Sequence, residues 1–406
     1  MGTLNVDQIR PDGSVVRDVD TTLSEARKNE LLLEALPDGA RAETYAGVRV
    51  VRFRDQVILK KQITHLGFPH PEFKKRIQIP NTWVDAHDHA LAEGLVPRFV
   101  GIYHYRGVTI FVDYDPGTYA RNKANNSSAW VYTNDLHQAQ TLGVFSRDDK
   151  NGNHITSVRG DQFAGYLLGV VEERHPRLDV LARFNKDFLT GSRLGWREAL
   201  EQMHAAAWPD RNQGEWPGFF LEYSLDGFIR RGGHDNLVQF QKVKRRGELD
   251  YDLVFLEGGR LDFYGDLKAS DSTQSESPGN DAEDLRGCIE EYGRFWYVVY
   301  EHRTWHARDN GDLATIAWNA WRRDMGYVAR KGYNELSYAR RFKEAVRFER
   351  MKVLEVNEAN FGVVLGDFKQ GKQPSGAARA LKVMINKRNI DNFLIYSESI
   401  EESAKA

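Results

Sequence analysis

Cysteine is almost absent from this chain: Cys288 is the single one among 406 residues. One cysteine excludes an intrachain disulfide and any zinc site built from several cysteines, and it fits a reducing compartment. The sequence also lacks a run of about eighteen apolar residues, and its first residues lack the basic and apolar segments of a secretory signal. We therefore expect a cytoplasmic protein that neither spans a membrane nor is secreted.

Other signatures are missing as well. There is no Gly-x-x-x-x-Gly-Lys-Ser/Thr phosphate loop, so no nucleotide cofactor is expected, and there is no Gly-x-Ser-x-Gly elbow. No internal repeat is visible. A chain of 406 residues exceeds what one core usually organises, which predicts two domains. The polar stretch SRDDKNGNHITS favours a boundary near residue 150, with domains over 1–150 and 151–406.

The net charge of −2 favours no partner by itself, but the basic residues are clustered. Several clusters alternate with aromatic residues, as on a surface that contacts a phosphate backbone. The solvated face of an ordinary sheet shows the same pattern, so both interpretations stay open. The candidate DNA-binding residues are Lys60, Lys61, Lys74, Lys75, Arg76, Lys242, Lys244, Arg245 and Arg246.

Strand patterns dominate the first 150 residues, with turns expected at Arg54-Asp55 and Arg106-Gly107. Beyond them, helices alternate with strands. Gly258-Gly259 predicts a two-residue hairpin turn, because paired glycines suit tight turns between strands. We expect further helices over 281–301, 314–350 and 377–386. The pattern as a whole indicates an α/β protein.

The second strand of that hairpin carries an acid, a spacer and a lysine: Asp266, Leu267 and Lys268. Residues two apart in a strand point to the same face. Asp252 begins the first strand and should lie across from or near Asp266, while Glu222 lies on the preceding helix and offers a third carboxylate. Two carboxylates facing one pocket can hold Mg²⁺, which polarises a phosphate and lowers the pKa of a bound water.

This set of residues resembles the active-site pattern of the PD-(D/E)XK nuclease superfamily, in particular type II restriction endonucleases. The resemblance covers roughly residues 215 to 310. It departs from the family pattern at one point, because Tyr251 rather than proline precedes Asp252, and Asp250 competes for the same role.

The resemblance implies a mixed sheet flanked by helices in the second domain, joined to a strand-rich N-terminal domain that aids DNA recognition. It implies a Mg²⁺-dependent, sequence-specific endonuclease that acts on double-stranded DNA and leaves 5′-phosphate and 3′-hydroxyl ends. Asp252, Asp266 and the Leu267 carbonyl would bind the metal, Lys268 would orient or activate the attacking water, and Glu222 would assist. Symmetric cutting favours a homodimer. The alternatives are a modification-dependent or structure-specific nuclease and an inactive DNA-binding protein.

Two other patterns compete for a functional role. Asp367 and Lys369 repeat the acid-x-lysine spacing in VVLGDFKQGK, but no matched helix and strand supply partners, so we interpret them as structural or DNA-facing. His87 and His89 have the spacing of a metal-binding pair. Because no alternating β/α pattern surrounds them, we favour a plain helix beginning near Asn81 or Thr82.

Overall fold

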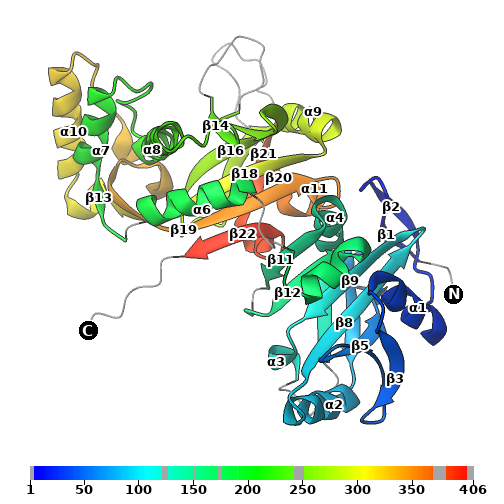
Figure 1. The fold of residues 1–406 in the computed structure, drawn as a ribbon. Helices are drawn as coiled ribbons and strands as arrows, with labels where there is room; N and C mark the ends of the chain where they lie inside the picture. The colour runs from blue at the N-terminus through cyan, green and yellow to red at the C-terminus, as the bar shows by residue number, and fades with distance from the viewer. Residues whose placement is uncertain are drawn as a thin grey trace. The chain divides into compact units, whose positions relative to one another are not determined.

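The protein is represented by a computed structural model that describes residues 4–120, 127–149, 151–171, 176–189, 191–241, 251–368 and 381–399. The chain divides into two compact units (Figure 1). Unit 1 comprises residues 1–174, 358–360 and 391–393, and unit 2 comprises 175–357, 361–390 and 394–406. The predicted boundary at 150 is too early, because the strand His154–Arg159 still pairs with Val108–Tyr114 inside the sheet of unit 1.

A seven-stranded mixed sheet forms the centre of unit 1, in the order β11-β12-β9-β8-β5-β4-β3. Its strands are β3 (Arg41–Tyr45), β4 (Val48–Phe53), β5 (Gln56–Gln62), β8 (Val96–Tyr105), β9 (Val108–Tyr114), β11 (Val144–Asp148) and β12 (His154–Arg159). Strands β5 and β8 are parallel, and the other neighbours in this sheet are antiparallel. The turns predicted at Arg54-Asp55 and Arg106-Gly107 are confirmed.

Helix α1 supplies much of the apolar cover of this sheet. Ser24 caps the helix by accepting a hydrogen bond from the backbone N–H of Arg27, and Leu31 and Leu32 pack on the sheet core. The helices of unit 1 are α1 (Glu25–Ala35), α2 (Asn81–Ala92), α3 (Pro116–Tyr119), α4 (Thr133–Leu142) and α5 (Phe163–Leu167), with a 3₁₀ turn, η1, at Gly160–Gln162. A side sheet contains β10 (Ser127–Tyr132), β7 (Lys74–Ile79) and β6 (Thr64–His65), and a hairpin contains β1 (Asn5–Ile9) and β2 (Val15–Val19).

Unit 2 is built on a second mixed sheet, in the order β13-β19-β18-β16-β15-β14, with β22 paired to β19. Its strands are β13 (Leu194–Gly195), β14 (Val238–Phe240), β15 (Leu253–Glu257), β16 (Arg260–Asp271), β18 (Arg294–His306), β19 (Lys343–Asn357) and β22 (Leu394–Ser399). Every side chain from Phe295 to Tyr300 is fully buried. A continuous apolar run of this kind is typical of a strand covered on both faces.

The helices of unit 2 flank this sheet (Figure 1). They are α6 (Pro176–Phe188), α7 (Trp196–Ala205), α8 (Trp216–Gly232), α9 (Ala282–Tyr292), α10 (Leu313–Asp324), α11 (Phe361–Val364) and α12 (Lys387–Ile390), with 3₁₀ turns η2 (Ala307–Asn310), η3 (Tyr333–Glu335) and η4 (Tyr338–Arg340). A side sheet contains β17 (Glu276–Asp281), β21 (Lys382–Asn386) and β20 (Leu365–Phe368). Within the described parts of the chain, no helix is both long and apolar enough to cross a membrane.

The two units share one order of elements. In each, a helix (α1 or α8) precedes three antiparallel strands (β3-β4-β5 or β14-β15-β16). A strand of the side sheet and then a helix follow (β7-α2 or β17-α9). The next strand (β8 or β18) runs parallel to the third strand. An antiparallel neighbour follows (β9 or β19), and a later strand (β10 or β21) pairs with the side-sheet strand. The chain therefore contains a structural repeat that its sequence does not display.

The α/β class is confirmed, but three of the predicted helices need correction. The helix expected over 281–301 ends at Tyr292, and β18 follows. The helix expected over 314–350 ends at Asp324, and β19 begins at Lys343. The described part of 377–386 contains strand β21. In β18 and β19 aromatic and charged residues imitate a helical period, but pairing between two long strands determines their conformation.

Candidate active site

The hairpin of β15 and β16 forms as the sequence predicts. Gly258 and Gly259 adopt φ values of 56° and 78°, a left-handed conformation that a two-residue turn requires and that glycine adopts without strain. Leu253 pairs with Gly265, which places Asp252 across from Asp266 at the next position. The predicted proximity of the two carboxylates is confirmed, because the Asp252 carboxylate also accepts a 3.4 Å hydrogen bond from the backbone N–H of Leu267.

A β-bulge interrupts this hairpin close to the turn. Phe255 pairs with Phe263 and Leu256 pairs with Leu261, so Asp262 is an extra residue on β16. The Asp262 carboxylate lies 2.6 Å from Arg177 Nη1 and 3.4 Å from Arg294 Nη2. Two arginines therefore hold the bulge residue in place.

The acid-x-lysine motif lies in the interior of the sheet rather than at its edge. Strand β16 pairs with β15 on one side and runs parallel to β18 on the other, where Asp266 lies beside Tyr297. Asp266 is 2 % exposed, and Lys268 Nζ lies 2.5 Å from its carboxylate. Such burial does not fit an ion pair on the surface of a strand.

The electrostatics of the two aspartates differ. Burial raises the pKa of Asp252, and the charges of Asp266 and Glu222 raise it further. Burial also opposes the charged form of Asp266, but the Lys268 ammonium and hydrogen bonds from Asp252, Lys268 and Asn280 outweigh it and lower the pKa of Asp266. Asp252 is therefore the more readily protonated carboxyl of the pair, and Asp266 is the more readily ionised one.

Glu222 occupies the predicted place on α8, and its charge reaches Asp252. The structure therefore brings together all four side chains that the sequence singled out, from α8, the residue before β15, and β16. Three carboxylates and one lysine form an acidic site. Such a site favours a bound cation, because the cation offsets the mutual repulsion of the carboxylates.

The chemistry of the donors fits Mg²⁺. Asp252, Asp266 and the Leu267 carbonyl are hard oxygen donors, and Mg²⁺ typically takes one or two carboxylates and keeps several waters. Within the described residues, no group of three or more His, Cys, Asp or Glu side chains is arranged to hold a metal ion by itself.

Sequence reasoning missed two further residues at the site, Asn280 and Tyr297. Asn280, on β17, hydrogen-bonds the Asp266 carboxylate through its side chain, and its backbone N–H donates to the Tyr297 hydroxyl over 3.2 Å. A Cβ at Gly279 would come within 2.7 Å of the same hydroxyl, so only glycine fits there. The sequence carries no signal for this contact, because β17 belongs to a different sheet from β16.

The aspartate of the competing acid-x-lysine pattern is paired with an apolar residue. Asp367 is exposed on β20 at the edge of the side sheet and lies opposite Val383. Lys369 falls outside the described residues. The geometry agrees with the structural interpretation of Asp367.

The two histidines lie on helix α2, as the sequence favoured, although Pro80 rather than Asn81 or Thr82 precedes the helix as its cap. His87 Nδ1 lies 3.1 Å from Asp88, and His89 Nε2 lies 3.2 Å from Glu93. Each ring therefore has a local carboxylate partner.

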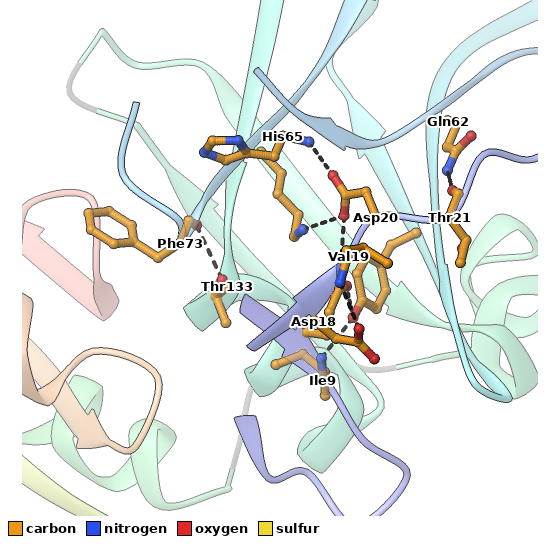
Figure 2. Close-up of polar contacts among 12 residues, drawn as sticks. Ile9, Asp18, Val19, Asp20, Thr21, Gln62, His65, Phe73 and Thr133 are labelled. Carbon is orange, nitrogen blue, oxygen red and sulfur yellow. Dashed lines mark hydrogen bonds and ion pairs between the residues drawn. The ribbon is translucent and has the colours of Figure 1, made fainter. Parts of the chain in front are cut away.

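The candidate DNA-binding residues of unit 1 differ in exposure. The side chains of Lys60 and Lys75 are completely buried, so neither reaches the surface. Asp20 accepts hydrogen bonds from Lys75 Nζ over 2.8 Å and from the backbone N–H of His65 over 2.6 Å (Figure 2).

The remaining candidates of unit 1 lie nearer the surface. Lys61, Lys74 and Arg76 are half-buried, and Lys74 Nζ lies 4.1 Å from the ring centre of Trp130. The predicted cluster of Lys242, Lys244, Arg245 and Arg246 lies outside the described residues.

Comparison with known protein families finds a match in the first half of the chain. The family described as methylase-associated X1 matches residues 54–167, a segment that lies within unit 1. No curated protein and no solved structure matches the chain.

Proposed function

We propose that this protein is a Mg²⁺-dependent endonuclease that cuts double-stranded DNA at specific sequences, as a type II restriction enzyme does. One observation carries the proposal. Asp252 and Asp266 lie opposite each other inside a mixed sheet, with Lys268 beside Asp266 and Glu222 on the covering helix. This is the residue set that the resemblance to the PD-(D/E)XK nucleases implies.

Each residue has a role in phosphodiester hydrolysis. Asp252, Asp266 and the Leu267 carbonyl would hold Mg²⁺, which supplies charge stabilisation to the phosphate and a more acidic bound water. Lys268 would orient the attacking water, while Asn280 and Tyr297 fix the position of Asp266. Attack on phosphorus breaks the bond to the 3′ oxygen and leaves 5′-phosphate and 3′-hydroxyl ends.

The methylase-associated description of the family matching unit 1 supports a restriction context. A restriction endonuclease acts beside a methylase that protects the host DNA. We further propose that the protein works in the cytoplasm, where that DNA lies, and as a homodimer, because two active centres are needed to cut both strands of a symmetric site. Light scattering of the free and DNA-bound protein tests the dimer, and a monomer in both states would contradict it.

The test of the proposal is digestion of unmethylated phage DNA with Mg²⁺ or EDTA. We expect discrete fragments with Mg²⁺, none with EDTA, and none from Asp266→Ala, which should still retard DNA on a gel. The matched control is Asp367→Ala, which removes the exposed aspartate of the competing pattern and should cut normally.

Each other outcome points elsewhere. Full cleavage by Asp266→Ala would refute the site assignment. Cleavage restricted to methylated DNA would indicate a modification-dependent nuclease, and salt-sensitive binding without cleavage would indicate a DNA-binding protein.

A further inference from the structure

The structural repeat can be aligned residue by residue at the candidate site. A glycine with positive φ follows the connecting helix in each unit: Gly94 at 72° after α2 and Gly293 at 74° after α9. Two residues beyond each glycine, parallel pairing begins, with Val96 beside Gln56 in unit 1 and Phe295 beside Tyr264 in unit 2. Gln56 is therefore equivalent to Tyr264.

In this register, Ile58-Leu59-Lys60 of unit 1 are equivalent to Asp266-Leu267-Lys268 of unit 2. The leucine and the lysine coincide, and the aspartate is replaced by isoleucine. The opposite strand agrees, because Ile58 pairs with Val51 where Asp266 faces Asp252. Both metal-binding carboxylates are therefore replaced by apolar side chains in unit 1.

The covering helix follows the same equivalence. Glu25 of α1 precedes the first strand residue, Arg41, by the same number of residues as Glu222 of α8 precedes Val238. The Glu25 carboxylate lies 3.9 Å from Lys60 Nζ. Unit 1 thus keeps the glutamate and the lysine of the site.

Apolar packing surrounds the positions in unit 1 that are equivalent to the two aspartates. Ile58 and Val51 are completely buried in one cluster with Leu31 and Leu32 of α1. The carboxylate oxygens that would hold a metal are absent, and hydrocarbon occupies their place. The equivalent position cannot bind Mg²⁺ in the manner proposed for unit 2.

Apart from Glu25, which pairs with Lys28 and lies near Lys60, the charged groups that act on Lys60 and Lys61 are basic. Lys60 Nζ donates a 3.3 Å hydrogen bond to the carbonyl of Arg49, whose side chain is exposed. Lys61 is half-buried and donates to the Gln78 carbonyl over 2.9 Å. Lys28 and Arg76 both repel the Lys61 ammonium, and this repulsion, after burial, lowers the pKa of Lys61.

We infer that unit 1 is a catalytically silent copy of the fold that carries the site in unit 2, and that its cationic surface binds DNA phosphates without metal and without cutting. This cationic surface is formed by Lys61 and Arg76, whose charges act on each other. The inference rests on the proposed function for the identity of the ligand. An acidic site needs a divalent cation before it can accept a phosphate, whereas a cationic surface accepts one directly.

The test is fluorescence anisotropy of a labelled 30-base-pair duplex, with the full-length protein in EDTA. Lys61→Glu/Arg76→Glu should weaken binding about ten- to hundredfold and reduce the slope of log affinity against log salt by roughly two. The matched control is Arg41→Glu/Arg54→Glu. It reverses two exposed charges of the same unit near the turn between β4 and β5 and should bind as the wild type does.

Equal binding by both double variants would overturn the DNA-binding part of the inference. The silent part is tested by Mn²⁺ titration calorimetry, in which Asp266→Ala should remove all specific Mn²⁺ binding. A specific Mn²⁺ site that survives in this variant and disappears on Glu25→Gln would place a metal in unit 1 and overturn it.

The two proposals can fail separately. If Asp266→Ala abolishes cleavage while Lys61→Glu/Arg76→Glu binds normally, the proposed function stands and the DNA-binding inference fails. If no DNA is cut but this double variant alone loses EDTA-resistant binding, the inference stands and the nuclease assignment fails.

Discussion

Units 1 and 2 share an arrangement of strands and helices, but one buries apolar side chains where the other buries carboxylates. At the equivalent position, unit 2 buries Asp266 against Asp252, whereas unit 1 buries Ile58 against Val51. The order and pairing directions of the five equivalent strands are the same, so the carboxylates are not needed to form this arrangement. Connectivity and apolar burial determine the architecture, and the chemistry depends on a few side chains placed upon it.

The difference also affects stability. Ile58 contributes apolar burial to the core of unit 1, while Asp252 is held in unit 2 against desolvation and the charges of Asp266 and Glu222. Functional sites commonly sacrifice stability in this way. We therefore expect the same kind of substitution to have different effects in the two units.

The largest expected effect separates the two equivalent lysines. Lys268→Met should lower the cleavage rate by about a hundredfold to ten-thousandfold, because the group that orients the water is lost. Lys60→Met should leave the rate within about twofold, since Lys60 is buried in unit 1 and contacts Glu25. Single-turnover cleavage measures both, with circular dichroism to confirm folding. An equal loss of cleavage rate in the two variants would contradict the different roles assigned to the two lysines.

The next effect tests the alignment itself. Ile58→Asp should lower the free energy of unfolding by about 3 kcal/mol, because packing is lost and a carboxylate is buried. Ile58→Val, as a control, should lower it by about 1 kcal/mol.

If the alignment is right, Lys60 should pair with the new aspartate as Lys268 pairs with Asp266. Urea unfolding of Ile58→Asp, Lys60→Met and the double variant should then show a coupling of about 1 kcal/mol or more. A coupling of zero would contradict the alignment.

A smaller effect of opposite sign is expected at the active site. Asp252→Asn should raise the free energy of unfolding in EDTA by about 1 kcal/mol, because the carboxyl that opposes Asp266 and Glu222 is removed. Added Mg²⁺ should stabilise the wild type more than the variant. Thermal unfolding with and without Mg²⁺ measures both effects, and a variant less stable than the wild type in EDTA would contradict the expected sign.

The smallest effect concerns pH. Burial and the charges of Lys343 and Lys387, partly opposed by the charge of Asp271, lower the pKa of His302 to about 3. The folded state therefore keeps His302 neutral, and its contribution to stability is complete above the unfolded pKa of about 6.5 and is lost as the pH falls below it. Between pH 7 and pH 6 the expected loss is about 0.7 kcal/mol.

This loss should be confined to unit 2. The register places Tyr103 at the equivalent position of unit 1, and burial raises the pKa of Tyr103, so it does not titrate in this range. Hydrogen exchange, followed by peptides of each unit, should show increased opening in unit 2 on acidification and less of it in His302→Gln. An equal pH response in the wild type and this variant would rule out His302 as the cause.

Much of the candidate site could be predicted from local signals. The paired glycines predicted the turn, the two-residue period placed Asp266 and Lys268 on one face, and the amphipathic pattern placed Glu222 on α8. All of these depend on near neighbours in the chain. Asn280 could not be predicted, because its contact with Asp266 depends on how β17 lies against another sheet.

The fold was predictable in turns and short elements, whose conformation depends on residues close together in the sequence. The helix expected over 281–301 was wrong beyond Tyr292, since β18 is buried on both faces and its residues need not alternate. The repeat was hidden for a related reason. Ile58-Leu59-Lys60 and Asp266-Leu267-Lys268 share two residues of three, and only strand pairing identifies them as equivalent.

The bulge at Asp262 decides which residues of the hairpin lie opposite each other. In a regular hairpin with a two-residue turn, paired residues are separated by an odd number of positions, as Val51 and Ile58 are. Asp252 and Asp266 are separated by an even number, so they can face each other only because one residue of β16 is left out of the pairing. Inserting or deleting one residue in either strand between the bulge and the aspartate would turn that aspartate to the other face of the sheet. A change of two residues would keep both side chains on the same face.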